Sequence, residues 1–178
     1  MEPIPTHEEC IQILKDAEAT QELIDHSEAV CKLSMAIGEL IMGTNMELVE
    51  AGALLHDLGR TKSNEIDHAI VGAEMAKELE LDENLQKIIL NHIGAGITEE
   101  DAEELGLPEG SYIPQSVEEK IVAHADNLID NATRRPVEEY LKVFVENEEY
   151  RIARRLINLH NKLSELTGMD IDQLIPEE

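Results

Sequence analysis

The sequence predicts an all-α protein, built as one compact bundle of about seven or more helices. Residues that cap helix N-termini recur along the chain, and each precedes a stretch in which apolar residues repeat with helical spacing. No stretch shows the sustained alternation of apolar and polar residues that marks a half-buried strand. Internal repeats, low-complexity runs and a Gly/Ser linker are also missing, so residues 1–178 are expected to form a single domain.

The N-terminal half contains five predicted helices, each with a recognisable start or stop signal. Their boundaries, in chain order, are a capping box of Thr6 with Glu9, a long helix from about Gln21 to Gly43, a helix capped by Asn45 that ends near Gly59, a helix from about Asp67 to Glu80, and a helix capped by Asp82 that ends around 94–96.

The C-terminal half continues the same pattern. A brief acidic helix is expected to begin with Thr98 and Asp101 and to break at 106–108. The remaining signals are a capping box of Ser116 with Glu119 that opens a helix to about Arg135, Pro136 in the first turn of the next helix, and a helical C-terminal region that reaches Leu166 with a break near Asn147.

The charge balance narrows the classes of partner. The chain has 39 acidic and 14 basic residues, which gives a formal net charge of −25. A field of this sign disfavours binding to nucleic-acid polymers and to anionic membrane surfaces. We interpret the charge as a means of solubility, or as adaptation to a salty cytosol, rather than as an acidic interaction surface.

Composition also predicts the core and the compartment. Trp is absent and Phe144 is the single Phe, so the core must be aliphatic. Cys10 and Cys31 are too few for a disulfide framework, which favours a reducing compartment. No uncharged apolar run approaches the ~18 residues that span a bilayer, and the N-terminus lacks the features of a signal peptide. A soluble cytoplasmic protein is therefore expected.

Four histidines and two aspartates stand on predicted apolar faces. His56 and Asp57 follow directly after an apolar helical stretch, and both are good ligands for divalent metals. Neither side chain belongs unpaired in a core. The other members of the set, placed by helical spacing, are His26, His68, His92 and Asp126.

Each of these positions has an alternative interpretation. A single inward histidine is more often a hydrogen-bonded core residue than a ligand, and an inward aspartate often caps a helix or pairs with arginine. His124 and His160 also lie on apolar stripes, and we interpret both as structural. His7 is expected to be exposed. The complete set, rather than any one member, predicts the metal site.

The order of the six residues resembles the HD superfamily of metal-dependent phosphohydrolases. The matching segments are Asp-His-Ser at 25–27, Leu-Leu-His-Asp-Leu-Gly-Arg at 54–60 and His-Ala-Asp-Asn at 124–127. The resemblance covers about residues 20–135 and leaves the helices of 136–178 unmatched. Within that part, the run His-Ala-Ile-Val-Gly-Ala at 68–73 and the position of His92 look closest to the diadenosine-tetraphosphatase branch.

The resemblance implies an HD-type helical fold and a metal centre. His26, His56, Asp57 and Asp126 would form the basic four-ligand site, and His68 and His92 are the extra histidines of branches that bind two metals. This implies about two divalent ions per chain, of Fe, Mn, Co, Ni, Zn or Mg, with Asp57 between them. A metal-bridging water would then act as nucleophile.

The implied substrate is a phosphate ester or anhydride of a nucleotide or another small phosphorylated molecule. Because the protein is strongly acidic, the site itself must supply positive charge. Arg60 and Lys62, just after Asp57, are the natural phosphate clamps. Arg134 and Arg135 form the other basic cluster, for which helix C-terminal capping is an equally good interpretation.

The chain also departs from its relatives. Many of them carry two adjacent histidines where this chain has Asn91 before His92, and many phosphodiesterases carry Lys in place of Arg60. The substrate is therefore open. Two other functions stay open as well: a di-iron oxygenase, like myo-inositol oxygenase of the same superfamily, and a non-catalytic helical module that holds metal.

Overall fold

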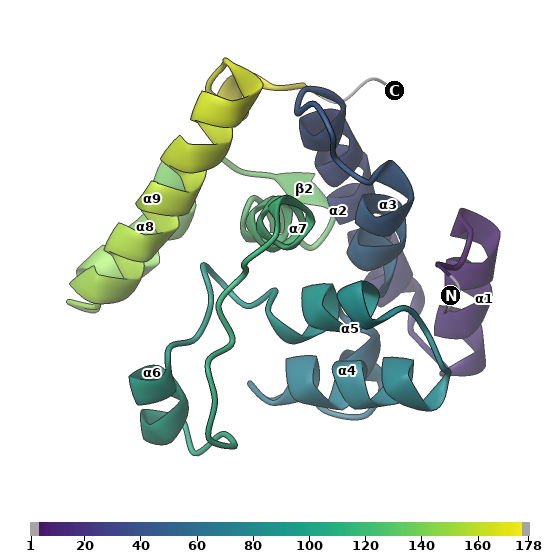
Figure 1. Ribbon diagram of the computed structural model, residues 1–178. Helices are drawn as coiled ribbons and strands as arrows, with labels where there is room; N and C mark the ends of the chain where they lie inside the picture. Colours follow the sequence, from purple (N-terminus) through teal and green to yellow (C-terminus); the bar gives the residue numbers. More distant parts are fainter. Residues whose placement is uncertain (1–3, 176–178) are drawn as a thin grey trace.

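The computed structural model describes residues 4–175, and these residues form an all-α fold with one small hairpin (Figure 1). The α-helices are α1 (His7–Asp16), α2 (Gln21–Glu39), α3 (Met46–Leu55), α4 (His68–Glu78), α5 (Glu83–Leu90), α6 (Glu99–Glu104), α7 (Val117–Asn127), α8 (Val137–Glu146) and α9 (Tyr150–Thr167). The shorter elements are the 3-10 helices η1 (Leu58–Thr61) and η2 (Ile171–Gln173) and the antiparallel strands β1 (Ile129–Asp130) and β2 (Thr133–Arg134).

The predicted helix starts are confirmed by hydrogen bonds at the caps. In both predicted capping boxes, and in a third formed by Thr98 and Asp101 at the predicted start of the acidic helix, the hydroxyl of the cap residue accepts from a backbone N–H and the third helical residue's carboxylate accepts from the cap's own N–H. The cap residues with these or similar hydrogen bonds are Thr6, Asn45, Asp82, Thr98 and Ser116.

Several helices end earlier than predicted. Helix α2 ends at Glu39, before Gly43, and α3 ends at Leu55 because the chain tightens into η1 directly after His56 and Asp57. Helix α5 ends at Leu90, so His92 lies just beyond it. These early ends place potential ligands at helix termini, where a side chain can turn away from the helix face.

The helix predicted to run as far as Arg135 is wrong beyond Asn127. The segment after it is a hairpin in which Ile129 pairs with Arg134 and Asp130 pairs with Thr133. Asn131, in the turn, has a positive φ of 54°, a conformation that asparagine tolerates better than most residues. Each strand is only two residues long, so the predicted all-α class is confirmed. The break at Asn147 is also confirmed.

Helix α7 lies at the centre of the fold, with α2, α3 and α5 on one side and the α8–α9 hairpin on the other (Figure 1). Aliphatic side chains fill the space between these helices, as composition predicts. Leu33, Leu54, Ile89 and Ile121, from α2, α3, α5 and α7, are almost fully buried. This packing brings together segments that are about one hundred residues apart. No helix within residues 4–175 is long and apolar enough to span a membrane.

Candidate metal centre

Asp57 lies between four histidine rings and offers one carboxylate oxygen to each pair. Its Oδ1 is 3.1 Å from Nε2 of His68 and 3.3 Å from Nε2 of His92. Its Oδ2 is 3.5 Å from Nε2 of His56 and 3.8 Å from Nε2 of His26. The side chain is therefore placed to bridge two neighbouring sites.

Asp126 completes the first of these sites. Its Oδ1 is 3.0 Å from Nε2 of His26 and 3.4 Å from Nε2 of His56. We call His26, His56, Asp126 and Oδ2 of Asp57 the first ligand group. His68, His92 and Oδ1 of Asp57 form the second ligand group. All six residues that the sequence predicted as ligands are thus brought together.

Helix ends deliver most of these side chains. His56 and Asp57 follow α3, His68 opens α4 and His92 follows α5. Close packing of backbones holds two of these ends together: a Cβ at Gly59 would lie 1.9 Å from the carbonyl oxygen of His68. Only glycine permits this approach of η1 to α4, and the approach fixes the second ligand group against Asp57.

Each histidine is oriented by a hydrogen bond from its Nδ1 to a backbone carbonyl. In three of the four, the acceptor belongs to the residue three positions earlier, at distances of 2.7, 2.8 and 2.7 Å. These pairs are His56 with Ala53, His68 with Glu65, and His92 with Ile89. The fourth, His26, donates across the fold to the carbonyl of Asn131 in the hairpin turn. When Nδ1 carries the proton, the Nε2 of a neutral ring presents a lone pair, which is the form that binds a metal.

The arrangement fits divalent cations because electron pairs face electron pairs. Nε2 of His68 and Nε2 of His92 lie 3.2 Å apart with both Nδ1 atoms already bound. His56 Nε2 and Asp57 Oδ1 are buried and have no hydrogen-bond partner among residues 4–175. Buried polar atoms of this kind are costly unless something pairs with them. Imidazole and carboxylate ligands suit Mn, Fe, Co, Ni and Zn, and Mg less well.

The charges of the cluster shift its protonation in opposing directions. Burial lowers the pKa of His56, but the Asp57 and Asp126 carboxylates outweigh burial and hold that pKa well above 6.5. Burial keeps the pKa of His92 below 6.5. The pKa values of Asp57 and Asp126 lie below their ordinary range, because the histidines outweigh the effect of burial. Both carboxylates are therefore ionised at neutral pH, as ligands must be.

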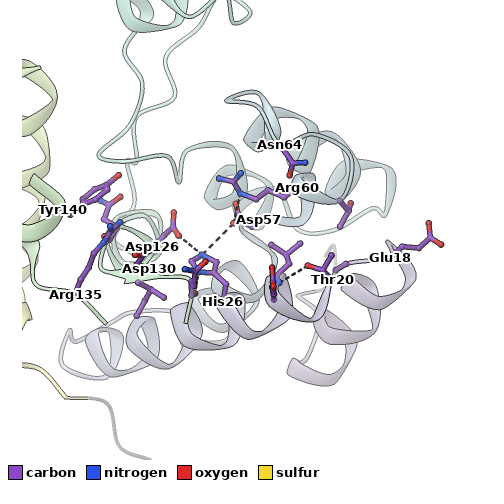
Figure 2. Close-up of a pocket in the computed structure, with 17 residues that line it drawn as sticks. Glu18, Thr20, His26, Asp57, Arg60, Asn64, Asp126, Asp130, Arg135 and Tyr140 are labelled. Carbon is purple, nitrogen blue, oxygen red and sulfur yellow. Dashed lines mark hydrogen bonds and ion pairs between the residues drawn. The ribbon is translucent and has the colours of Figure 1, made fainter. Parts of the chain in front are cut away.

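A cavity of about 520 Å³ opens onto the first ligand group. Figure 2 shows Arg60 and Asn64 on one side of His26 and Asp126, and Arg135 and Tyr140 on the other. The lining also includes the buried Asn127 and four exposed acidic and amide residues, which form the rim: Glu18, Glu22, Asp130 and Asn131. The volume is within the range of small-molecule sites, about 300–1,000 Å³.

Two arginines of the cavity are fixed in different ways. Arg60 donates from Nε to Oδ2 of Asp57 at 3.0 Å, so it orients the bridging carboxylate. Arg135 donates from Nε to the carbonyl of Asn127 at 3.1 Å, and its guanidinium lies over the Tyr140 ring, 4.5 Å from the centroid. Both were predicted to contact substrate, and both line the cavity.

The other two predicted substrate residues lie elsewhere. Lys62 is exposed and is not part of the cavity lining. Arg134 donates to the carbonyl of Ile171 at 2.7 Å and lies near Asp172. Arg134 closes strand β2, and successive residues of an extended chain face opposite ways, so Arg134 and Arg135 cannot both reach the cavity.

The sequence analysis missed several residues of the site. Asn131 was placed within a helix, so its role as the acceptor for His26 was not found. Tyr140 and Asn64 carry no motif, and only the packing brings them to the cavity. Asn91, which directly precedes His92, is buried and donates to Glu119 at 2.8 Å.

His124 and His160, which the sequence analysis interprets as structural, lie against each other and outside the centre. Nε2 of His124 lies 2.9 Å from Nδ1 of His160, and Nε2 of His160 lies 3.0 Å from Oδ1 of Asp170. Burial lowers the pKa of His124 to about 3, so this ring stays neutral. The pair joins α7 to α9 and contributes no ligand to the centre.

Comparisons with known proteins agree with this geometry. The family described as HD domain matches residues 23–130. A tRNA (cytidine(56)-2'-O)-methyltransferase of Picrophilus torridus is 43% identical over 96% of this chain and 50% of its own length. The homologous enzyme of Thermoplasma volcanium is 39% identical over the same shares. The chain thus spans about half the length of these two relatives.

Other relatives match along their whole length or in fold. An uncharacterised protein of Methanocaldococcus jannaschii is 41% identical over 89% of this chain and 97% of its own length. The HD domain of the L. monocytogenes phosphodiesterase PgpH, solved in complex with cyclic-di-AMP, has a TM-score of 0.61 at 18% identity, over 93% of this chain and 94% of that one. Family match and fold agree, and the chain belongs to the HD-domain family.

Proposed function

We propose that this protein is a metal-dependent phosphohydrolase that acts on a nucleotide or another small phosphorylated molecule. One observation carries the proposal: Asp57 presents its two oxygens to different histidine pairs, and the Nε2 atoms of both pairs face that carboxylate. A bridging carboxylate between two groups of nitrogen ligands is suited to two ions. The ligands would be His26, His56, Asp57, His68, His92 and Asp126.

The residues of the chain support this chemistry at three points. Two divalent ions held there would supply a water of lowered pKa and positive charge for the phosphoryl oxygens. The carbonyl acceptors fix the histidine rings, so little reorganisation accompanies binding. Arg60 lines the cavity and has its Nε bound to Asp57, which leaves its terminal amino groups to bind a phosphoryl oxygen in this proposal.

The cavity favours a small substrate with a phosphate and an aromatic group. In this proposal the phosphate lies against Arg60 and the first ligand group, and a base lies near Tyr140 and Arg135. The acidic rim and the net charge of −25 repel a long polyanion. The PgpH HD domain, which shares this fold, was solved in complex with a small nucleotide of this kind, cyclic-di-AMP.

The names of other relatives set the range of substrates to test. Ribonuclease Y of Pseudothermotoga lettingae is 26% identical, with 28% of its length covered. The tRNA methyltransferases are about twice as long as the part that matches, so methyl transfer is not carried over to this chain. Lys62 and Arg134 lie outside the cavity and are given no part in the proposed reaction.

The test is hydrolysis by metal-loaded protein. Protein purified without oxygen would be analysed for metals and assayed with added Mn or Fe against mononucleotides, dinucleoside polyphosphates, cyclic dinucleotides and short RNA. We expect turnover of a small nucleotide that an Asp57→Ala variant lacks. Equal rates for the wild type and Asp57→Ala on every substrate would overturn the proposal. Turnover that requires O₂ would instead indicate the di-iron oxygenase.

A further inference from the structure

A separate group of ligating side chains lies where α1, α2 and α3 meet, and it shares no residue with the metal centre. Nδ1 of His7 is 3.2 Å from Oε1 of Glu50, and Nε2 of His7 is 3.1 Å from Oε1 of Glu28. The thiol of Cys31 lies 4.0 Å from the backbone carbonyl of Glu50. One ligand atom each from His7, Cys31 and Glu50 can be chosen so that all three lie within 4.8 Å of one another.

The hydrogen bonds of His7 divide its ring between two roles. Nδ1 of His7 faces Glu50, and Nε2 of His7 faces Glu28. A histidine that gives one nitrogen to a metal commonly donates from the other to a carboxylate, which orients the ring. Glu28 and Cys31 are three residues apart on α2 and so share one face of that helix.

The charges of the group leave room for a cation. Two carboxylates surround one imidazole, and the nearly buried Cys31 thiol lies beside them. Burial and the two glutamates raise the pKa of Cys31 to about 12, so without a cation the thiol stays protonated. Lys32 lines the same cavity and is exposed, and it makes no ion pair with Glu28 or Glu50.

The group is open to entry from solvent. A cavity of about 480 Å³ is lined by all four side chains, His7, Glu28, Cys31 and Glu50. The side chains of His7 and Glu50 are 37% and 35% exposed, whereas Cys31 is 5% exposed. An ion can therefore reach the thiol past the imidazole and the carboxylates, and water can fill a remaining coordination position.

We propose that His7, Cys31 and Glu50 form a second metal site that binds Zn²⁺, with Glu28 as the orienting carboxylate for His7. Nitrogen, thiolate and carboxylate together are ligands that zinc accepts, whereas Mg²⁺ and Ca²⁺ prefer oxygen alone. Binding releases the thiol proton of Cys31 to solvent, and the thiolate takes its place on the ion. The ion joins α1 to α2 and α3, so it stabilises the N-terminal helix (Figure 1).

Cobalt substitution distinguishes this site from the metal centre. The six residues of the centre contain no thiolate, so a cobalt–thiolate charge-transfer band in the near ultraviolet reports only a cysteine site. Reduced, metal-free protein titrated with Co²⁺ is expected to show that band, and Zn²⁺ is expected to abolish it. The band should be lost in Cys31→Ser and kept in Cys10→Ser, which removes the other buried cysteine.

Two further measurements separate ligation from folding. Zn²⁺ should protect Cys31 from alkylation, as mapped by mass spectrometry, and raise the melting temperature of the wild type but not of Cys31→Ser. Glu28→Gln should weaken Zn²⁺ binding by about 10- to 100-fold, since it removes the orienting carboxylate. The proposal fails if folded wild-type protein shows no thiolate band, or if the band persists in Cys31→Ser.

Discussion

The Nε2 atoms of His68 and His92 lie 3.2 Å apart, and the Nδ1 atoms of both rings are bound to backbone carbonyls, so two neutral rings have no proton to place between them. Both rings donate from Nδ1 to backbone carbonyls, so the contact joins two lone pairs. A shared cation removes this conflict, and Oδ1 of Asp57 lies within 3.3 Å of both nitrogens.

The first prediction concerns the number of ions. His92→Ala removes one of three ligands from the second ligand group and leaves the first intact. In a Cys31→Ser background, which removes a ligand of the proposed zinc site, we expect the metal content to fall from two ions per chain to one, with loss of hydrolysis. Elemental analysis after gel filtration measures the content. His160→Gln alters a buried ring outside the centre and should leave the content unchanged, and two ions in His92→Ala would contradict the two-group arrangement.

Arg60 tests the orientation of the bridging carboxylate. Arg60→Ala removes the donor to Oδ2 of Asp57 and a positive charge from the cavity. We expect kcat/KM to fall by about 10- to 100-fold, in the range found for partners of metal ligands. Steady-state kinetics of the hydrolysis provide the measurement. The exposed Arg154→Ala is the matched control, and an equal loss in both variants would assign the effect to overall charge.

Gly59 tests the close approach of η1 to α4. In Gly59→Ala the new methyl group would lie 1.9 Å from the carbonyl oxygen of His68 and 2.5 Å from the amide nitrogen of Gly72. Because both neighbours are backbone, we expect a loss of about 3 kcal/mol or more in the free energy of unfolding. Urea denaturation of metal-free protein measures it. Gly110→Ala, whose nearest neighbour is 3.6 Å away, should be nearly neutral.

Asn131 tests the hairpin turn behind His26. Asn131→Val places a β-branched residue at a φ of 54°, which should cost about 1–2 kcal/mol and displace the carbonyl that His26 contacts. We expect weaker binding of one ion, measured by chelator competition. Asn131→Gly keeps the backbone conformation and the carbonyl, so its affinity should match that of the wild type. If Asn131→Gly binds as weakly as Asn131→Val, the side chain rather than the turn is responsible.

Asp101 gives a prediction for pH. Burial raises its pKa, but hydrogen bonds from Thr98 and the Arg155 guanidinium outweigh burial and hold the pKa below 3.8. A carboxyl with a lowered folded pKa contributes stability that is present above its unfolded pKa and is lost as pH falls through the folded value. Asp101→Asn should therefore cost about 1 kcal/mol near pH 6. Urea midpoints from pH 6 to pH 3 should converge for variant and wild type; a constant difference would contradict the assignment.

The sequence predicts most of the helices, and which histidines and aspartates gather in the core, because both depend on helical periodicity. His26 and Asp126 lie on apolar stripes, and inward stripes of neighbouring helices must meet in the core. The aliphatic core follows from composition in the same way. The single-domain boundary and the diadenosine-tetraphosphatase branch stay predictions.

The remainder depends on contacts that no local pattern encodes. Helix α7 ends at Asn127, where the side chain donates to the carbonyl of Gly94, and the hairpin then reaches His26 from 105 residues away. The local sequence pattern alone therefore predicts a helix that continues to Arg135. The position of Arg134 failed for the same reason, because in a strand its direction alternates with that of Arg135.

The bonds from three imidazole rings to carbonyls of their own preceding turns have a consequence for how the centre is loaded. Each ring is held by its own stretch of chain, so the pocket for the cations exists before any cation arrives. Chelators should empty it without unfolding the protein, unlike a zinc finger, whose fold depends on its metal. The free energy of metal binding is then not reduced by the cost of ordering the polypeptide, so the ions bind more tightly.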